Sequence, residues 1–336
     1  MNRALLLYNA LRKFPRADIG IFPTPIQQLH NLEKRVGHSP LWIKRDDLTG
    51  LAFGGNKTRN LEFLLGDAVS KNCDTIIVPG PIQSNLCCIT AAAANKLGLR
   101  CIQIFNDEKP TEITGNSTLN YLLGADSRYI GKVDLDTQAK YMENLASNLK
   151  AKGERPYVVY NGASTPLGAL GYVKAALEIY EQVLKSKANM ESIVIAAGYG
   201  GTAAGLIYGI GVLGIPFKVH VISVEFDKQT LRSIFQNFMP ELERLLGLSF
   251  DCSIDDVAVI YDDYMGEGWG CSTKESEKMI HLFPQTEGIF VEKVYTSKPL
   301  VGMMDLLSKK AFASREGVCY WHTGGLPALF AQVKQC

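Results

Sequence analysis

Short apolar runs alternate with longer stretches of helical periodicity along most of this sequence, and this alternation constrains the fold more than any other feature. Thr75–Gly80, Arg100–Phe105 and Ser192–Ala197 are short and largely apolar, as expected of strands that are buried on both faces. Leu86–Leu97 contains four consecutive alanines and is followed by a glycine, which predicts a helix and its end. Strands that alternate with helices predict an α/β fold with mainly parallel sheets.

Further segments continue the alternation. Pro40–Asp47 indicates a strand that runs into a charged loop, and Tyr157–Tyr160 and Lys218–Val224 indicate two more strands. Thr165 can cap a helix that has Pro166 at its first position. The chain has 336 residues, enough for two domains, but no linker or internal repeat divides it. A second domain is therefore expected to be inserted in the first or packed closely against it.

The charge balance and the cysteine pattern exclude several classes of protein. Lys and Arg number 35 and Asp and Glu number 34, so the net charge of +1 gives no reason to expect a nucleic acid or a membrane surface as partner. No apolar run approaches the ~18 residues of a spanning helix, and the N-terminal segment lacks the features of a secretion signal. The eight cysteines include no C-x-x-C pair, and the five histidines form no metal motif. We expect a cytoplasmic protein with reduced thiols and no metal.

A lysine follows a glycine-rich turn and begins an amphipathic segment. The turn is Gly54-Gly55-Asn56-Lys57. The apolar residues that follow it with helical spacing are Leu61, Leu64, Leu65, Ala68 and Val69. Lys57 is therefore expected in the first turn of a helix, where the helix dipole and partial burial both favour the neutral amine. A neutral amine attacks carbonyl carbons and forms Schiff bases, although this stretch alone also fits a surface lysine.

A second glycine cluster follows the predicted strand Ser192–Ala197. The sequence Gly198-Tyr199-Gly200-Gly201-Thr202 can turn several backbone N–H groups toward one point at a helix start, which suits a phosphate. The pattern Gly198-x-Gly200-x-x-Ala203 also fits a dinucleotide fingerprint, with Glu225 at the distance of an acid that meets a ribose hydroxyl. An NAD-binding oxidoreductase is therefore an open alternative, and so is a tight turn without a ligand.

Two more turns join predicted strands to helices. Gly80–Asn85 leads into the alanine-rich helix, so Ser84 and Asn85 stand at a helix start whose free N–H groups suit a carboxylate. The same residues also fit a helix cap and nothing more. Near the C-terminus, His322-Thr323-Gly324-Gly325 ends a strand with a hydroxyl and two glycines, which again fits an ordinary turn.

Taken together, these four features describe a site for pyridoxal phosphate and an amino acid. The sequence resembles the family of pyridoxal-phosphate enzymes that includes 1-aminocyclopropane-1-carboxylate deaminase and D-cysteine desulfhydrase, which has the tryptophan-synthase-β (type II) fold. The motifs that carry the resemblance run nearly from end to end. They are Pro23-Thr24-Pro25, Lys44-Arg45-Asp46-Asp47, Gly54-Gly55-Asn56-Lys57, Gln83-Ser84-Asn85, Gly200-Gly201-Thr202, Val294-Tyr295-Thr296 and His322-Thr323-Gly324-Gly325.

The resemblance implies a role for each site residue. Lys57 forms the Schiff base and, with Ser84 and Tyr295, is expected to be catalytic. The expected cofactor-binding residues are Asn56, Lys57, Asn85, Gly198, Gly200, Gly201, Thr202, Thr296 and Thr323. The expected substrate-binding residues are Gln83, Ser84, Asn85, Trp269 and Tyr295.

The resemblance also implies the domain organisation. Residues 1–60 and 165–336 are expected to form a large cofactor-binding domain, and residues 61–164 a smaller α/β domain inserted in it. The pyridoxal phosphate would lie in the cleft between them, and the chain would form a homodimer.

Two positions favour one reaction within the family. The deaminase carries a glutamate where this chain has Thr296, facing the pyridine nitrogen, and a leucine where it has Thr323, whereas desulfhydrase-like members carry hydroxyl residues at both. A hydroxyl leaves the pyridine nearer neutral, which suffices to remove a Cα proton and expel a good leaving group from Cβ. The expected reaction is α,β-elimination from D-cysteine to pyruvate, hydrogen sulfide and ammonia. The alternatives are 1-aminocyclopropane-1-carboxylate deamination, and β-elimination or β-replacement on another β-substituted amino acid.

Three positions depart from the family pattern. Leu86 stands where a histidine is usual, Asn60 where a lysine near the phosphate is usual, and Trp269 where a tyrosine faces the substrate. Losing that phenol removes a proton donor or acceptor and narrows the pocket. A substrate other than D-cysteine, or a member that binds the cofactor without catalysis, is therefore a further alternative.

Overall fold

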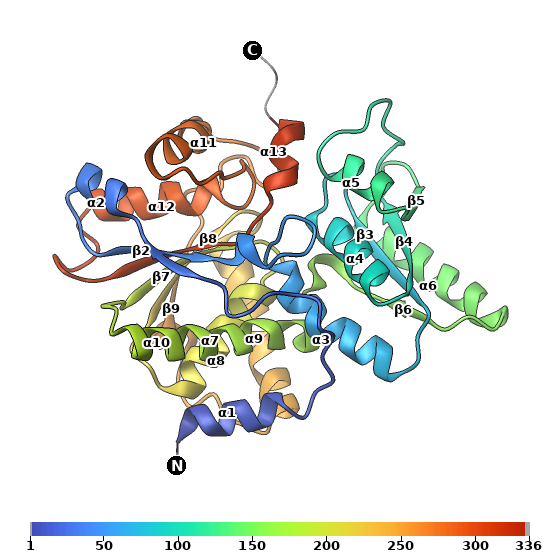
Figure 1. The fold of residues 1–336 in the computed structure, drawn as a ribbon, viewed down its shortest axis with the longest axis horizontal. Helices are drawn as coiled ribbons and strands as arrows, with labels where there is room; N and C mark the ends of the chain where they lie inside the picture. The colour runs from blue at the N-terminus through green and yellow to red at the C-terminus, as the bar shows by residue number, and fades with distance from the viewer. Residues whose placement is uncertain (1, 333–336) are drawn as a thin grey trace.

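The computed structural model describes residues 2–332, which build two sheets that lie side by side (Figure 1). The larger sheet has six strands in the order β1-β2-β10-β7-β8-β9. All neighbouring pairs in it are parallel except β1 with β2. Its strands are β1 (Ile26–Gln28), β2 (Leu41–Arg45), β7 (Ser192–Ala197), β8 (Lys218–Ser223), β9 (Ala258–Tyr261) and β10 (Val318–His322).

The smaller sheet has four parallel strands in the order β5-β4-β3-β6. Its strands are β3 (Thr75–Gly80), β4 (Arg100–Phe105), β5 (Asp126–Tyr129) and β6 (Pro156–Val158). The helices connecting them are α4 (Asn85–Lys96), α5 (Asn116–Leu122) and α6 (Leu135–Ala151). All of these elements fall within residues 61–164, the range expected for an inserted domain, while the exact domain limits stay a prediction.

Helices cover both faces of the larger sheet. Ile193 and Ile195 of β7 pack into the cluster formed with α1, α7, α8 and α9, whereas Val194 points to the opposite cluster with α2, α11 and α12. This alternation explains why the central strand β7 is apolar from Ile193 to Ala197. The helices are α1 (Arg3–Leu11), α2 (His30–Val36), α7 (Pro166–Ser186), α8 (Gly201–Leu213), α9 (Lys228–Leu246), α10 (Ile254–Val257), α11 (Lys274–Glu287), α12 (Ser297–Ser308) and α13 (Leu326–Gln332).

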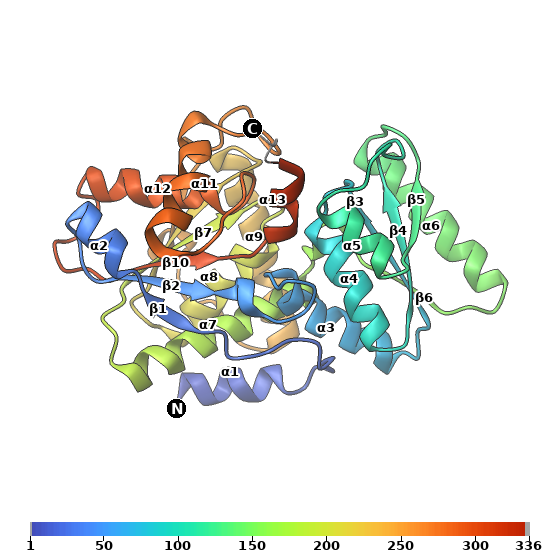
Figure 2. The same cartoon turned by 45° about the horizontal axis from the view of Figure 1, so that its top comes forward.

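Helix α3 (Lys57–Ser70) lies between the two sheets (Figures 1 and 2). It packs against α7 of the larger layer and α4 of the smaller one. Most of its residues from Thr58 to Ala68 are buried, including polar ones. Two short 3-10 turns, Asp46–Leu48 and Asn161–Ala163, lie close to its N-terminal part. The segment that carries Lys57 is therefore held by both halves of the molecule.

The α/β prediction is confirmed, and β3, β4 and β7 have the predicted bounds. Strand β6 (Pro156–Val158) is an exception, because it starts one residue before the predicted range 157–160 and ends two residues before the end of that range. Val69, predicted on the buried face of the helix, is 45% exposed because α3 leaves the core in its last turn. The antiparallel strand β1 was not predicted from the sequence, since it is short and has no apolar alternation.

Across residues 2–332, no helix is long and apolar enough to cross a bilayer. The same residues contain no group of three or more His, Cys, Asp or Glu arranged to hold a metal ion. The seven cysteines of this range are free thiols, and the eighth, Cys336, lies outside the described residues.

Candidate active site

The candidate site is a cavity of about 310 Å³ between the two sheets. It lies at the carboxyl ends of β3 and β7, which is where parallel sheets commonly bind ligands. Most of the sequence-predicted site residues line it. These are Asn56, Lys57, Gln83, Ser84, Asn85, Gly198, Gly200, Gly201, Thr202, Trp269, Tyr295 and Thr323.

Lys57 is the first residue of α3, as the sequence predicted. The turn before it requires glycine, because Gly54 has φ of +75° and a Cβ there would lie 1.9 Å from the carbonyl oxygen of Asp47. Gly55 pairs with Gly324 of the C-terminal turn, so the two glycine motifs are joined directly. The Lys57 Nζ donates to the carbonyl oxygen of Gly162 at 2.6 Å, and both residues line the cavity.

Two titratable groups in this cavity, Lys57 and Glu225, have pKa values shifted toward pH 7. Burial lowers the pKa of Lys57 from 10.5 to about 8, although the carboxylate of Glu225 pulls it upward. Burial raises the pKa of Glu225 from 4.5 to about 7, against the opposite pull of Lys57. The lowered pKa agrees with the partly neutral Lys57 amine expected from the sequence, and desolvation is its main cause.

The glycine turn after β7 leads into α8, which begins at Gly201 without a side-chain cap. Gly200 has φ of +88°, and Ser164 Oγ accepts the N–H of Gly201 at 2.6 Å. Asn56 Nδ2 donates to Thr202 Oγ1 at 3.0 Å and so ties this turn to the lysine turn. Beyond the N–H of Gly201, which Ser164 takes, the N-cap residue Gly200 offers no side chain to the first-turn N–H groups of α8, which suits a phosphate group.

The loop before α4 brings Gln83, Ser84 and Asn85 to the opposite side of the cavity. Ser84 Oγ accepts the N–H of Cys87 at 3.2 Å, so the interpretation of Ser84 as a helix cap is correct. Asn116 fixes the loop, because its side chain donates to Asn85 Oδ1 at 2.7 Å and its N–H to Gln83 Oε1 at 2.9 Å. Ser84 thus caps a helix and faces the cavity at once.

Trp269 and Tyr295 lie together at the cavity. The indole Nε1–H of Trp269 donates to the Tyr295 hydroxyl oxygen at 2.5 Å, and Trp269 is 42% exposed. Lys298 holds the loop that carries Trp269, because its fully buried Nζ donates to the carbonyl oxygens of Met265 and Gly268 at 2.7 and 3.0 Å. The indole that replaces the expected phenol therefore donates a hydrogen bond to the tyrosine and takes no proton itself.

Thr296 and Asn60 are buried away from the cavity lining. Thr296 is fully buried, and its Oγ1 accepts the N–H of Glu292 at 2.7 Å. Asn60 donates from Nδ2 to the carbonyl oxygen of Gly168 at 2.9 Å. Leu86, the third departure from the family pattern, does line the cavity. The cofactor role expected of Thr296 stays a prediction. Of the two threonines Thr296 and Thr323, Thr323 is the one that lines the cavity.

Several lining residues were not predicted from the sequence as parts of this site. Tyr199, Asn106, Leu135, Gln138 and Glu225 all contribute to the cavity wall. Asn106 directly follows β4 and Leu135 is the first residue of α6, and neither position carries a local motif. Glu225 had been singled out for a ribose hydroxyl, but the better signal was its place just after the carboxyl end of β8, beside β7.

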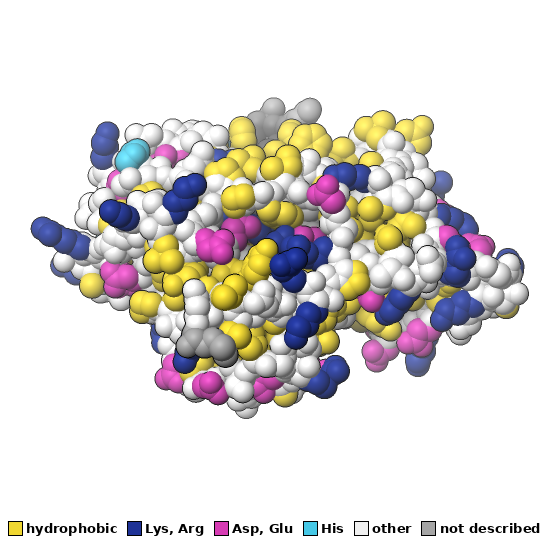
Figure 3. All heavy atoms as spheres, turned by 60° about the horizontal axis from the view of Figure 1, so that its bottom comes forward, with side chains coloured by type: hydrophobic (Ala, Val, Ile, Leu, Met, Phe, Trp, Pro, Cys, Tyr) yellow, Lys and Arg dark blue, Asp and Glu magenta, His cyan; other side chains and the backbone are white. Residues whose placement is uncertain are grey.

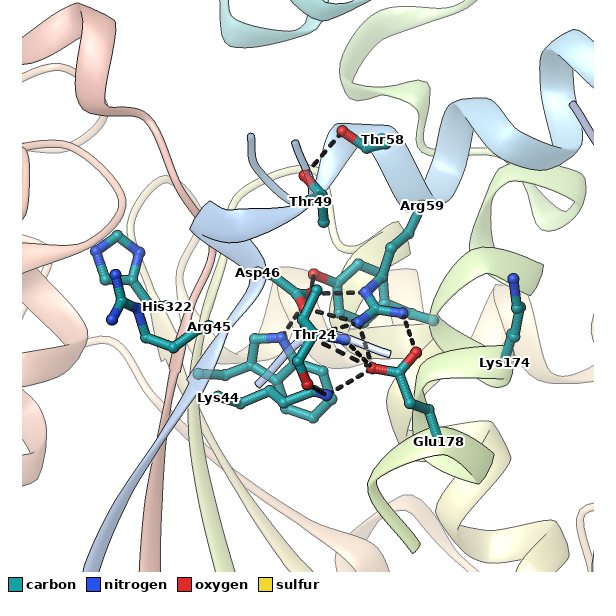
Figure 4. A network of polar contacts seen from close by, with 12 residues as sticks. Thr24, Lys44, Arg45, Asp46, Thr49, Thr58, Arg59, Lys174, Glu178 and His322 are labelled. Carbon is teal, nitrogen blue, oxygen red and sulfur yellow. Dashed lines mark hydrogen bonds and ion pairs between the residues drawn. The ribbon is translucent and has the colours of Figure 1, made fainter. Parts of the chain in front are cut away.

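A buried network of charges lies behind the lysine turn (Figure 4). Arg59, two residues after Lys57, contacts Asp46 at 2.7 Å and Glu178 at 2.8 Å through Nη2. Lys44 Nζ contacts the same Glu178 carboxylate at 2.5 Å. Two cations thus meet two carboxylates, and each charge has a partner within hydrogen-bonding distance.

Neutral donors complete this network around Asp46. The Tyr172 hydroxyl and the Trp321 indole N–H donate to Asp46 Oδ2 at 2.6 and 2.7 Å. Burial alone would raise the pKa of Asp46, but Arg59 outweighs it and the pKa falls to about 2. The same pairing raises the pKa of Arg59 against its burial. The network therefore stays ionised and fixes the first turn of α3 relative to the larger sheet.

A second cavity, of about 830 Å³, lies beside α1, α7 and the strands β1 and β2. The face that α1 crosses carries Lys and Arg side chains interspersed with acidic and apolar ones (Figure 3). None of the sequence-predicted site residues lines this cavity. The cavity at Lys57 is therefore the candidate active site.

The residues of the Lys57 cavity fit pyridoxal phosphate, the expected cofactor. The uncapped start of α8 suits its phosphate, and a lysine amine with a lowered pKa suits its aldehyde. The cavity also holds hydroxyl and amide side chains at Ser84, Asn85 and Thr323, which can orient polar groups of a cofactor or substrate.

The sequence matches the model of a protein family described as "Pyridoxal-phosphate dependent enzyme" over residues 17–324. It is 38% identical over 324 residues to "Putative 1-aminocyclopropane-1-carboxylate deaminase" of Pyrococcus horikoshii, covering 96% of each chain. It is 37% identical over 333 residues to "D-cysteine desulfhydrase" of Serratia proteamaculans, covering 97% of this chain and 98% of that one.

Solved structures show the same fold. The crystal structure of an ACC deaminase homologue matches with a TM-score of 0.88 and 38% identity, covering 97% of this chain and 96% of that chain. Threonine deaminase isoform 2 from Solanum lycopersicum matches with a TM-score of 0.67 at 14% identity, covering 96% of this chain and 84% of that chain, which supports the type II fold alone.

Proposed function

The chain belongs to the family of pyridoxal-phosphate-dependent enzymes and is a lyase of that family, and from this premise we propose that it catalyses α,β-elimination on a small amino acid. The proposed substrate is D-cysteine, which with one water gives pyruvate, hydrogen sulfide and ammonia. The observation that carries the proposal is the Lys57 amine, which lies in the cavity with a pKa lowered to about 8 by burial. Such an amine is neutral for part of the time near pH 7 and can act as a base.

The cofactor would be held by residues from both layers. Lys57 would carry it through the side-chain amine, and Gly198–Thr202 with the first turn of α8 would bind its phosphate. Asn85 and Thr323 would contact the ring. When bound, pyridoxal phosphate supplies an electron sink that weakens the bonds to the substrate Cα.

The substrate would be oriented by the loop before α4. Ser84 and the N–H groups of the first turn of α4 would bind its carboxylate, and Asn116 keeps that loop in place. This arrangement would direct the Cα–H bond toward Lys57 Nζ, which takes the proton. Closing the cavity with Trp269 would limit the access of water to the reacting carbons.

Tyr295 would serve the leaving group. Its hydroxyl oxygen accepts the Trp269 N–H, so its own proton is free to be donated into the cavity. Burial raises the pKa of Tyr295, which keeps the hydroxyl protonated at neutral pH. We propose that it donates this proton to the sulfur that leaves Cβ and recovers one from water afterwards.

The choice of elimination over cyclopropane opening rests on two threonines. The deaminase is expected to have a glutamate at position 296 and a leucine at position 323, and this chain has hydroxyl residues at both. The named relatives include both activities, at 38% and 37% identity, so identity alone does not favour either one.

The test is a turnover assay with the purified enzyme. D-cysteine, L-cysteine and 1-aminocyclopropane-1-carboxylate are supplied separately, while sulfide, pyruvate and ammonia are measured. The proposal predicts sulfide and pyruvate in equal amounts from D-cysteine. Ammonia from the cyclopropane compound, without sulfide from either cysteine, would replace the proposal with the deaminase alternative.

We further infer a homodimer, on the resemblance to the family. Light scattering coupled to size-exclusion chromatography measures this directly. A mass near twice the 36.9 kDa of the chain is expected, and a mass of one chain would contradict it.

A further inference from the structure

Glu225 lies inside the candidate active site, where neither a carboxylate nor its role was expected from the family resemblance. It follows β8 and lines the cavity together with Lys57, Tyr199 and Tyr295. Its Oε2 lies against Gly198, since a Cβ built on that glycine would be 3.0 Å from it. A carboxylate therefore occupies the wall beside the proposed phosphate turn.

One oxygen of the Glu225 carboxylate has no hydrogen-bond partner among the residues that the structure describes. Its Oε2 is buried and forms no hydrogen bond to any residue of the described range 2–332. Lys57 Nζ donates to the carbonyl oxygen of Gly162. A buried carboxylate oxygen without a hydrogen-bond partner is costly, so an orphaned oxygen of this kind calls for an explanation.

We propose that Glu225 is a positioning residue that sets the basicity of Lys57, because its carboxylate supplies the counter-charge when the Lys57 amine takes up a proton. The inference rests on the proposed function for its catalytic use, since that function assigns Lys57 as the base that accepts the Cα proton. The electrostatic link between the two side chains itself does not depend on the substrate.

The groups that face Glu225 leave Lys57 as its counter-charge. Tyr199, from the turn after β7, and Tyr295, from the segment before α12, both have pKa values raised by burial and stay neutral at physiological pH. The charge of Glu292, from the same segment, raises the pKa of Tyr295. The Glu292 carboxylate is itself hydrogen-bonded, because it accepts the N–H groups of Val294 and Tyr295. Among the described residues, Lys57 is the cation whose charge lowers the pKa of Glu225.

The proton count is simple. When Lys57 takes a proton at Nζ it becomes an ammonium, and the Glu225 carboxylate makes the local pair neutral overall. When Lys57 gives the proton up, the Glu225 carboxylate loses its counter-charge, and burial then favours the form of Glu225 that has taken a proton from solvent. A lysine and a carboxylate in direct contact would instead stay charged, because their mutual attraction would outweigh desolvation.

The test compares the titration of Lys57 in the full-length protein with and without the Glu225 charge. The cofactor is removed, the protein is treated with acetic anhydride across a series of pH values, and acetylation of Lys57 is quantified by peptide mass spectrometry. The midpoint is expected near 8 in the parent protein. Glu225→Gln keeps the shape and removes the charge, so the midpoint is expected to fall.

Two further variants make the result specific. Glu225→Asp retains the charge and is expected to keep a midpoint above that of Glu225→Gln, and it also serves if the glutamine variant folds poorly. Glu267→Gln removes an exposed charge from the loop that carries Trp269, and is expected to leave the midpoint unchanged. Equal midpoints in the parent and Glu225→Gln proteins would overturn the inference.

The same samples separate this inference from the proposed function. Uptake of pyridoxal phosphate by the parent protein, followed by its visible absorption band, tests the cofactor assignment alone. A protein that takes up no cofactor but shows the shifted Lys57 midpoint would remove the proposed function and keep the electrostatic link. A protein that takes up the cofactor but has the same Lys57 midpoint with and without the Glu225 charge would keep the cofactor assignment and remove the electrostatic link.

Discussion

Two buried clusters of charge meet on helix α3, only two residues apart, and they behave in opposite ways. At Arg59 each charge touches an opposite charge, with contacts of 2.7 Å to Asp46 and 2.8 Å to Glu178. At Lys57 the amine donates to a backbone carbonyl, and Oε2 of the nearby carboxylate of Glu225 has no hydrogen-bond partner among residues 2–332. The helix thus carries a fully paired cluster and an unpaired one.

The difference shows what direct contact does to a buried ionisable group. For the pair of Asp46 and Arg59, contact overcomes desolvation, so the pKa of Asp46 falls to about 2 and that of Arg59 rises, whereas burial still lowers the pKa of Lys44 in the same cluster. Desolvation dominates in the second, so the pKa values of Lys57 and Glu225 move to about 8 and about 7. A group locked in one protonation state can only hold structure, whereas one that titrates near pH 7 can also move protons.

The largest expected effect is the loss of turnover when Lys57, in the unpaired cluster, is replaced. Lys57→Ala should lower turnover by at least about 10⁴-fold, because it removes both the attachment point of the cofactor and the proposed base. Circular dichroism and the urea midpoint should stay near those of the parent. Lys71→Ala, at the other end of α3, is the matched lysine control and should retain full activity; equal losses in both variants would contradict the assignment.

On the structural side, Arg59→Met should lower the free energy of unfolding by about 3–5 kcal/mol, because it leaves the buried Asp46 carboxylate without its cation and Glu178 with Lys44 alone. Urea unfolding followed by circular dichroism measures this. Lys71→Met breaks the exposed Lys71–Asp67 pair of the same helix, in which Lys71 is 62% exposed, and should cost less than about 1 kcal/mol. Similar losses for the two variants would mean that the network is not a special support of α3.

Acid should weaken the first cluster only below about pH 4, after Glu225 of the second cluster has already become protonated. Because the folded-state pKa of Asp46 is depressed to about 2, its contribution is present above the unfolded value of 3.8 and is lost as the pH falls toward 2. The loss amounts to about 2 kcal/mol at 1.36 kcal/mol per pH unit. Urea midpoints of the parent and Asp46→Asn proteins between pH 5 and pH 2 should therefore converge; parallel curves would contradict the Asp46 assignment.

Glu225 should show the opposite slope. Its folded-state pKa is raised to about 7, so between pH 4.5 and 7 the folded protein binds more protons than the unfolded chain, and its stability falls as the pH rises. Glu225→Gln should remove this slope and be the more stable protein at pH 7, by about 1–3 kcal/mol. Urea unfolding at both ends of this range measures the difference, and an unchanged slope would count against a buried carboxylate.

The smallest effect is expected at the rim of the cavity. Trp269→Phe keeps an aromatic ring and removes the N–H that donates to Tyr295. Losing one hydrogen bond of about 1 kcal/mol should reduce kcat/KM by roughly fivefold. Steady-state kinetics with the confirmed substrate measures this. An unchanged kcat/KM would mean that the bond to Tyr295 has no part in turnover.

The sequence was informative wherever the deciding residues were neighbours in the chain. The glycine turn, Lys57 at a helix start, the turn after β7 and the cap at Ser84 could all be predicted, because each depends on a few consecutive residues. The family resemblance extended this to Tyr295 and Thr323, which line the cavity from the far end of the chain.

The paired cluster was beyond such reasoning. Arg59 and Glu178 are 119 residues apart, and nothing in the local pattern of either indicates that they meet. Glu225 was noticed but assigned to a ribose hydroxyl, since its distance along the chain fitted that role while its distance from Lys57 in space was unknown. Thr296 followed the motif but is buried outside the cavity lining, because Glu292 folds the segment before α12 back on itself.

The central claim is that Lys57, kept partly neutral in this cavity, holds the cofactor. The most direct measurement is to reduce the enzyme with borohydride in the presence of pyridoxal phosphate, digest it and identify the modified lysine by mass spectrometry. The account predicts that the cofactor is fixed on Lys57 alone. Fixation on a buried lysine such as Lys44 or Lys298, or on surface lysines at random, would contradict it.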